Sequence, residues 1–230
     1  MKDFSLFTQK TSIVFKDSGL LRQAFTHRSY LNEHPKQKIE HNERLEFLGD
    51  AVLELVVTNY LYNRFPEKPE GDMTAYRAAL VNTNMISEAA LDLGFNDLLL
   101  LSRGEARDTG KARQYILANT YEAVVGAIFI DQGYAVAERF IAGSLFPRLE
   151  GVLKNQTWQD AKSKFQEKAQ EILSITPSYT VLDESGPDHD KHFTVGVYVG
   201  DEEAGRGEGK SKQEAEQNAA RDALKQRGWE

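Results

Sequence analysis

The sequence predicts two domains: an all-α domain followed by a small α+β domain with the element order α-β-β-β-α. Along residues 1–150, apolar residues recur at the three- and four-residue spacing of amphipathic helices. After residue 155 the pattern changes, because helical segments there flank segments of alternating β-branched and aromatic residues. A chain of 230 residues is long enough for two domains, which we place at 1–150 and 158–228.

The first domain is expected to contain six helical blocks. Pro66 should end the third block, Gly94 the fourth and Gly133 the fifth, because proline cannot continue a helix and glycine commonly follows its last residue. Asn42 is well placed to cap the helix that follows it. The blocks lie around residues 4–15, 20–31, 42–64, 73–91, 112–130 and 135–149.

In the second domain, two helices are expected to pack on one face of an antiparallel sheet. The segments "SYTVLDESG" and "HFTVGVYVG" have the alternation of strands, whereas "EEAGRGEGKS" is interpreted as a Gly-rich turn region. The helices are expected at 161–173 and 212–226.

Composition excludes several classes of protein. The chain has no cysteine, so disulfides and thiolate metal sites are absent and any metal must bind oxygen or imidazole. No apolar run approaches the ~20 residues of a membrane span, and the N-terminus lacks a signal-peptide pattern. We therefore expect a cytoplasmic protein without a membrane partner. The net charge of -7 means that any phosphate binding depends on local basic clusters.

The segment "NERLEFLGDAVLE" at residues 42–54 places four acids at offsets of zero, three, seven and eleven. On a helix these fall within an arc of roughly 80°. A solvated face is the ordinary interpretation, but residues 41–63 contain only one basic residue, Arg44, to form local ion pairs. The stripe consists of Glu43, Glu46, Asp50 and Glu54. The apolar residues expected to point away and be buried are Leu45, Leu48, Val52, Leu55 and Val56.

A second acidic helix is expected in "YILANTYEAVVGAIFI". This segment is so apolar that Glu122 should be partly buried, and a buried carboxylate needs a partner. Asn119 lies three residues earlier on the same face. If the two helices pack face to face, Glu46, Asp50, Asn119 and Glu122 form an oxygen-rich cluster. Such a cluster favours Mg²⁺, with Mn²⁺ as a substitute, over zinc.

The chemistry expected of such a site is the activation of water and the stabilisation of charge at a phosphate. A ferritin-like di-iron site is the competing interpretation, but it requires a Glu-x-x-His pattern that neither acidic helix contains.

Several segments together resemble bacterial ribonuclease III. "HNERLEFLGDAVLE" is similar to that family's signature helix and "ILANTYEAVVGAIFIDQGY" to its second acidic helix. "THRSYLNE", "EGDMTAYRAALVN" and "LSRGEARDTGKAR" follow the family's order, and "GEGKSKQEAEQNAA" resembles part of a double-stranded RNA-binding domain. The resemblance covers nearly the whole chain. It implies a catalytic domain at 1–150 and a double-stranded RNA-binding domain at 158–228.

The resemblance implies a homodimeric endoribonuclease that hydrolyses double-stranded RNA with Mg²⁺ and leaves 5′-phosphate and 3′-hydroxyl ends. Its expected tasks are the processing of rRNA, mRNA and small-RNA precursors. Asp50 and Glu122 match the catalytic acids, and Glu43 matches an accessory acid. Phe47 matches an aromatic residue that enters the partner subunit, although a core phenylalanine explains it equally well. The implied metal ligands are Glu46, Asp50, Asn119 and Glu122.

Two positions depart from the family pattern. Asn119 stands where Asp is commoner, so it brings an amide oxygen but no charge, and weaker metal binding would follow. Glu54 stands where Asn is usual and is interpreted as a solvated bystander.

Duplex RNA is held by its shape, through phosphates and 2′-hydroxyls. Ser211 and Glu214 predict a capping box, which places Lys210 and Lys212 at the start of the last helix, where the helix dipole assists phosphate binding. A plain helix cap with a solvated end is the alternative. The positions that match RNA contacts are Gln166, Glu167, His189, Lys210, Ser211 and Lys212.

The most basic stretch of the first domain either lines the catalytic valley or is an ordinary surface loop, and the sequence favours neither. It carries Arg103, Arg107, Lys111 and Arg113.

Three functions remain open at this stage. A metal-dependent endonuclease is favoured because Glu46, Asp50 and Glu122 are all present. A catalytically weakened RNA-binding protein is the alternative, because Asn119 replaces the usual Asp. A small-molecule metallohydrolase would leave the duplex-binding tail unexplained.

Overall fold

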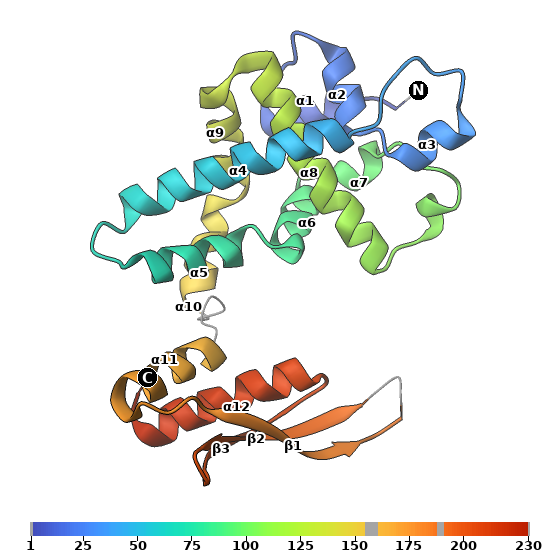
Figure 1. Ribbon diagram of the computed structural model, residues 1–230. Helices are drawn as coiled ribbons and strands as arrows, with labels where there is room; N and C mark the ends of the chain where they lie inside the picture. The colour runs from blue at the N-terminus through green and yellow to red at the C-terminus, as the bar shows by residue number, and fades with distance from the viewer. Residues whose placement is uncertain (1, 155–160, 188–190, 230) are drawn as a thin grey trace. The chain divides into compact units, whose positions relative to one another are not determined.

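The computed structural model describes residues 2–154, 161–187 and 191–229. These form two compact units, Met1–Trp158 and Gln159–Glu230, each with its own core (Figure 1). The predicted fold class is confirmed, since unit 1 is helical and unit 2 has the order α-β-β-β-α. Within the described residues, no helix has the length and apolar character needed to cross a membrane. The predicted RNA-binding residue His189 lies outside the described ranges, as does residue 158, the predicted start of the second domain.

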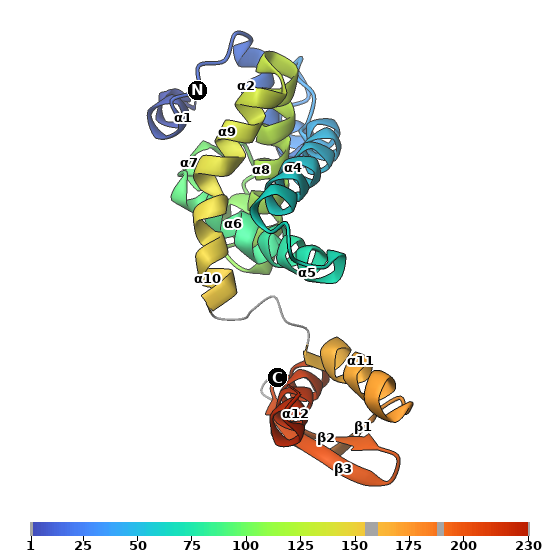
Figure 2. The same cartoon turned by 90° about the vertical axis from the view of Figure 1, so that its left-hand side faces the viewer.

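Unit 1 is organised around two long helices, α4 and α8, which lie side by side in both views (Figures 1 and 2). A cluster of aromatic rings fills the core beside them, with Phe25 and Phe95 meeting edge to face at 4.9 Å. The helices are α1 Ser5–Thr11, α2 Ser18–Ala24, α3 Arg28–Glu33, α4 Glu43–Arg64, α5 Glu70–Leu80, α6 Thr83–Asp92, α7 Phe95–Leu98, α8 Lys111–Gln132, α9 Tyr134–Ser144 and α10 Leu149–Lys154, with 3₁₀ turns η1 Glu105–Arg107 and η2 Phe146–Arg148.

Two of the predicted helical blocks are each divided into two helices. Residues 20–31 separate into α2 and α3 because the backbone between them pairs with Leu100. His27 donates its N–H to the carbonyl of Leu100, and Leu100 donates its own N–H to the carbonyl of Phe25. The short segment between the two helices therefore forms a β-bridge instead of a helix. Residues 73–91 separate into α5 and α6 because Asn82 caps the second helix, accepting from the backbone of Met85 at 2.9 Å. The last block is also interrupted, at η2.

The prediction that Asn42 caps α4 is wrong. Asn42 precedes the helix, but its side chain makes no capping hydrogen bond. It is buried and donates instead to the backbone carbonyl of Ala24 at 3.1 Å. Its role is therefore to tie the start of α4 to the end of α2.

The crossing of α4 and α8 depends on two glycines. A Cβ atom at Gly49 would overlap the backbone carbonyl of Glu122 and lie 2.8 Å from the amide nitrogen of Gly126. A Cβ atom at Gly126 would likewise overlap the carbonyl oxygen of Leu45. The two backbones therefore touch, and only glycine permits this close approach.

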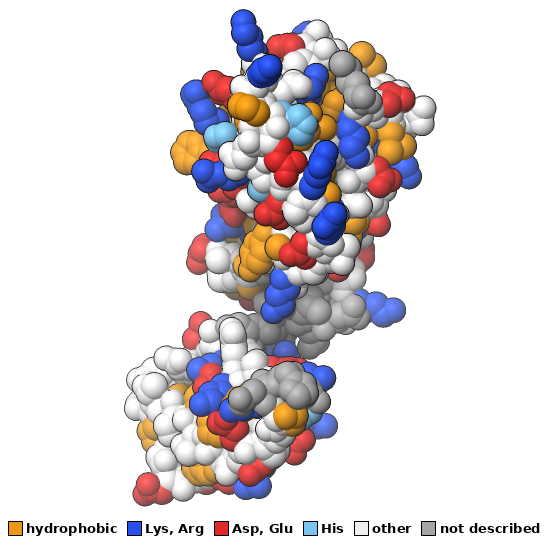
Figure 3. Space-filling view, turned by 90° about the vertical axis from the view of Figure 1, so that its right-hand side faces the viewer, with side chains coloured by type: hydrophobic (Ala, Val, Ile, Leu, Met, Phe, Trp, Pro, Cys, Tyr) orange, Lys and Arg blue, Asp and Glu red, His pale blue; other side chains and the backbone are white. Residues whose placement is uncertain are grey.

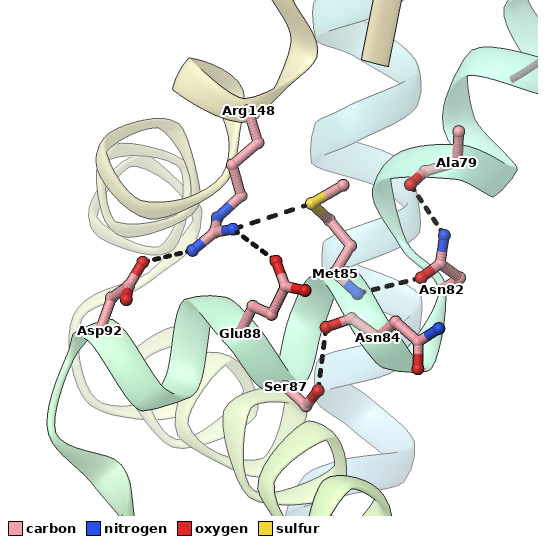
Figure 4. A network of polar contacts seen from close by, with 8 residues as sticks. All are labelled: Ala79, Asn82, Asn84, Met85, Ser87, Glu88, Asp92 and Arg148. Atoms are coloured by element: carbon pink, nitrogen blue, oxygen red, sulfur yellow. Dashed lines mark hydrogen bonds and ion pairs between the residues drawn. The ribbon is translucent and has the colours of Figure 1, made fainter. Parts of the chain in front are cut away.

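A polar network fastens the end of unit 1 to α6 (Figure 4). The Arg148 guanidinium, from η2, donates to Glu88 at 3.1 Å and to Asp92, and it also approaches the sulfur of Met85. Its side chain is only 20% exposed, so these carboxylates offset the cost of desolvating the guanidinium. The start of α10 is thereby fixed against α6.

Unit 2 places both helices on one face of an antiparallel sheet with the order β1-β2-β3 (Figure 1). Alternate residues of β2, from Phe193 to Val199, are buried beneath the helices. The elements are α11 Ala161–Leu173, β1 Ser178–Ser185, β2 His192–Val199, β3 Glu202–Gly209 and α12 Lys212–Arg227.

The Gly-rich segment predicted as a turn region is a strand. Its glycines lie directly beneath α12, where a Cβ atom at Gly205 would lie 2.5 Å from the backbone nitrogen of Ala223, and one at Gly209 would lie 2.6 Å from that of Ala215. A Cβ atom at Gly207 would overlap the backbone at Ala219. The glycines are therefore required by close helix-on-sheet packing, not by a turn.

We expect Gly49→Ala to destabilise unit 1 by about 3 kcal/mol or more, because the added methyl group overlaps backbone that cannot rotate away. The control is Gly143→Ala in α9, where a Cβ atom meets nothing within 4 Å. Since alanine is the better helix former, that change should be neutral or slightly stabilising. Urea denaturation followed by circular dichroism measures both changes, and equal effects would contradict the role given to Gly49.

Candidate functional site

The crossing of α4 and α8 brings four predicted site residues near one another. Gly49, which contacts the backbone of Glu122, lies between Glu46 and Asp50 on α4. Asp50 and Glu46 are consequently close enough to Glu122 for their negative charges to raise its pKa. The side chain of Asn119 donates toward the carboxylate of Glu46. The predicted face-to-face packing of the two acidic helices is present.

The outer acids of the stripe are paired with arginines from other helices. Arg28 of α3 lies 3.3 Å from Glu43, and Arg77 of α5 lies 3.1 Å from Glu54. Glu54, interpreted as a solvated bystander, is 40% exposed, but it is also held by a tertiary ion pair that local sequence spacing does not reveal.

The inner acids are left without cations. Among the described residues, no Lys or Arg forms an ion pair with Glu46, Asp50 or Glu122. Burial and the negative charges of Asp50, Glu46 and Glu54 raise the pKa of Glu122 to about 8. Burial, with Glu43 and Asp50, also raises the pKa of Glu46, although the hydrogen bond from Asn119 opposes this shift. The fold therefore concentrates carboxyl groups without basic partners at one place.

The donor set suits a hard divalent cation, because it consists of carboxylate and amide oxygens beside a buried surface. The side chains do not form a closed cage: within residues 2–154, 161–187 and 191–229, no three Asp, Glu or His side chains converge on one point. Like charges in this cluster repel each other, so convergence requires a cation to offset the repulsion. The structure thus provides neighbouring donors whose final arrangement depends on side-chain rotation.

Two arginines and one tyrosine near the acids were missed from the sequence. Arg28 and Arg77 belong to segments that resemble the family, but no motif indicated their pairing with Glu43 and Glu54. Tyr115 lies four residues before Asn119 and is 60% exposed, so it extends the solvent-facing side of α8 beyond the acids. Helical spacing from Asn119 was the available signal.

The basic stretch around the start of α8 is only partly free to contact a ligand. Arg113 donates to Asn96 at 2.8 Å and to the carbonyl of Glu105 at 2.6 Å, so it anchors η1 and is not available to line a valley. The side chains of Arg103, Arg107 and Lys111 are exposed. Figure 3 shows Lys and Arg interspersed with Asp and Glu over the face of unit 1 that carries α3 and this loop.

Phe47 is not a core residue, because its side chain is 83% exposed. It lies beside a hollow of about 610 Å³ that is lined partly by Leu20, Leu48 and Ile130. The expectation that Leu55 is buried is also wrong, since this residue is 58% exposed on the same helix. The exposed ring of Phe47 is thus available to contact another molecule.

In unit 2, Ser211 caps α12 as predicted, because its hydroxyl accepts from the backbone of Glu214 at 3.2 Å. The returning bond of the predicted capping box is shifted by one residue, since the Glu214 carboxylate accepts from the backbone of Lys210 at 2.8 Å and not from that of Ser211. Gln166 and Glu167 are exposed on α11 and line a hollow of about 570 Å³.

Comparison with known proteins gives consistent matches over both units. Residues 17–149 match a family described as ribonuclease-III-like, and residues 161–227 match the double-stranded RNA binding motif. Ribonuclease 3 of Enterococcus faecalis is 44% identical over 218 residues, which cover 94% of each chain. Ribonuclease 3 of Geobacillus thermodenitrificans is 45% identical over 222 residues, covering 96% of this chain and 89% of that one.

A solved structure agrees with these matches. The nuclease domain of ribonuclease III from Campylobacter jejuni is 40% identical, with a TM-score of 0.56. The match covers 63% of this chain and 99% of that one.

We expect the pH dependence of stability to reveal the site in metal-free buffer. Below pH 4.5, Glu122 is protonated in both folded and unfolded chains and contributes nothing. Between 4.5 and about 8, the unfolded chain releases the proton while the folded chain retains it, so the folded state loses stability as pH rises. Glu122→Gln should therefore be more stable than wild type at pH 8, by on the order of 2 kcal/mol after solvent screening, and nearly equal at pH 4.5.

Thermal unfolding in EDTA across this pH range measures the effect. Glu67→Gln, at an exposed position of unit 1, is the matched control and should show no such pH-dependent gain. If the difference in stability between Glu122→Gln and wild type were the same at every pH, the pKa of Glu122 would not be raised in the folded protein.

Proposed function

The chain belongs to the ribonuclease III family and is an endoribonuclease, and from this we propose that it hydrolyses phosphodiester bonds in double-stranded RNA with Mg²⁺ at the α4–α8 crossing. Mn²⁺ is the expected substitute, and the proposed products carry 5′-phosphate and 3′-hydroxyl ends. We further propose that it acts in the cytoplasm on precursors of rRNA, mRNA and small RNAs. The observation that carries the proposal is the uncompensated cluster of Glu46, Asp50 and Glu122.

The proposed roles follow from the position of each donor. Glu46 and Glu122, from opposite helices, would hold the metal between them, with Asp50 and Asn119 completing its surroundings directly or through water. When bound, Mg²⁺ would supply the charge that activates water and stabilises oxyanions at phosphorus. Glu43, already paired with Arg28, would act as an accessory acid at the edge of the site.

The Asn119 side chain opposes the rise in the pKa of Glu46 by donating toward its carboxylate, and an ionised Asp at this position could not donate. An Asp would also add a fourth carboxyl group to an already repulsive cluster. Asn119 therefore supports a site with lower charge and weaker metal affinity, and the three acids needed for catalysis are retained. This argues against the interpretation of the chain as a binding protein alone.

Unit 2 would make most of the binding contacts with the RNA duplex. Its exposed α11 residues Gln166 and Glu167 would contact the minor groove, while Ser211 and the lysines at the start of α12 would meet phosphates. His189, which lies outside the described residues, is proposed to reach the next minor groove.

We also propose that two copies form a homodimer through Phe47. In a two-fold arrangement, the exposed ring of each subunit would enter the hollow of about 610 Å³ beside Phe47 on the other. Burial of two such rings would supply central anchors for the interface. The solved nuclease domain from Campylobacter jejuni was described with a region involved in dimer formation.

The main test is a gel assay with a perfectly paired RNA duplex. Wild type should cut the duplex in Mg²⁺ and not in EDTA. The products should carry 5′-phosphates that a phosphatase removes. Glu122→Gln should bind the duplex but lose cleavage by about a hundredfold or more, since it removes a charge from the reacting site. Glu67→Gln should cut normally.

The variant Asn119→Asp distinguishes an active endonuclease from a protein that only binds RNA. If the wild type is inactive in Mg²⁺ while Asn119→Asp cuts, the chain is an RNA-binding protein whose catalysis has been lost. Cleavage by wild type supports the endonuclease, and in that case Asn119→Asp should chiefly lower the Mg²⁺ concentration required.

The dimer is tested by light scattering after gel filtration across a range of concentrations. Phe47→Ala should weaken dimerisation by about thirtyfold or more, as expected when a central aromatic anchor is lost. Leu91→Ala, at a 49% exposed position on α6, is the control and should leave it unchanged. An unaltered dimer in Phe47→Ala would place the interface elsewhere.

A further inference from the structure

At the start of α12, Lys212 shares a carboxylate of the protein itself with Lys191, the residue before β2. Glu184 of β1 accepts from the Lys191 ammonium at 2.6 Å through one oxygen, and its other oxygen lies 4.0 Å from the Lys212 ammonium. Lys212 was predicted from the sequence as a phosphate contact. In the structure, its charge is shared with an acid from a strand that lies 28 residues earlier in the chain.

The geometry of this group is that of an occupied anion site. Two ammonium groups, from the start of β2 and the start of α12, point at one carboxylate. The hydrogen bond from Lys191 and the charges of both lysines lower the pKa of Glu184, so this acid remains ionised at neutral pH. A phosphate group would make the same charge-assisted bond to Lys191 and the same ion pair with Lys212.

We propose that Glu184 competes with RNA phosphate for Lys191 and Lys212 and so limits the affinity of unit 2 for double-stranded RNA. The inference rests on the RNA binding proposed above. It identifies Glu184, an acid, as a residue that determines affinity within a basic binding surface.

Two features make the competition reversible. The side chains of Glu184, Lys191 and Lys212 are 39%, 35% and 59% exposed, and ion pairs at such positions are weak and screened by salt, so an incoming phosphate can displace the carboxylate. The backbone of Glu184 is fixed opposite Phe193 in the β1–β2 ladder, which keeps the carboxylate close to the lysines. The Lys212 ammonium also lies 5.6 Å from the Phe193 ring, which holds the lysine in place when the carboxylate leaves.

The experiment measures binding of a fluorescent, perfectly paired RNA duplex to the full chain in EDTA, by anisotropy over a series of salt concentrations. Glu184→Gln preserves shape and removes the charge, and it should tighten binding by about three- to tenfold at low salt. Because up to two lysines are released to phosphates, the slope of log affinity against log salt should become steeper by about 1 to 2. Glu184→Ala, which also removes the acceptor, should tighten binding at least as much.

Asp183→Asn is the matched control. It removes the same charge at the neighbouring residue of β1, outside the ion pairs of Glu184, and should change affinity much less. Adding Glu184→Gln to Lys212→Gln should give a smaller gain than adding it to wild type, because one of the competing partners is already gone.

Equal gains from Glu184→Gln and Asp183→Asn, or no gain from either Glu184 variant, would overturn the proposal while leaving RNA binding intact. If wild type and all variants fail to bind the duplex, the proposed function fails together with the inference.

Discussion

The backbone contact between Gly49 and Gly126 is the constraint on which unit 1 depends. It allows α4 and α8 to approach until the carbonyl of Glu122 touches α4, and any side chain at either glycine would separate the two helices. The same contact sets the site, because Glu46 and Asp50 flank Gly49 and therefore lie next to Glu122. The same glycine contact positions both the core and the acids, so the acids cannot be moved apart without loosening the core.

The charge distribution around this crossing is uneven. Arginines from α3 and α5 pair with the outer acids of the stripe, while the inner acids have no basic partner among the described residues. The cost of this arrangement is seen in the raised pKa of Glu122, and it is a cost that a bound cation would remove. The outer arginines confine the unpaired carboxyl groups to the place where the helices cross. The stripe of four acids thus contains two residues that are paired with arginines and two that are not.

Unit 2 also depends on glycines that allow two backbones to touch, here between a strand and a helix. Glycines of β3 lie against alanines of α12, which brings the start of that helix close to the end of the sheet. The result places Lys212 beside Glu184 and Phe193, residues that are distant in sequence. The negative net charge is then compatible with RNA binding, because what matters is where individual lysines lie and which acids they meet.

The sequence alone determined the class of each unit, the two acidic helices and the Ser211 cap of α12, because helical periodicity, glycine and proline positions and Ser-x-x-Glu spacing are local properties. It predicted the meeting of Glu46 and Glu122 only conditionally, since packing depends on residues far apart in the chain. The tertiary structure decided what local patterns could not contain: the pairing of Glu54 with Arg77, the exposure of Phe47 and the use of Arg113 as an anchor. It also turned a Gly-rich "turn" into a strand, because those glycines are required by the helix above them and not by the local conformation of the chain.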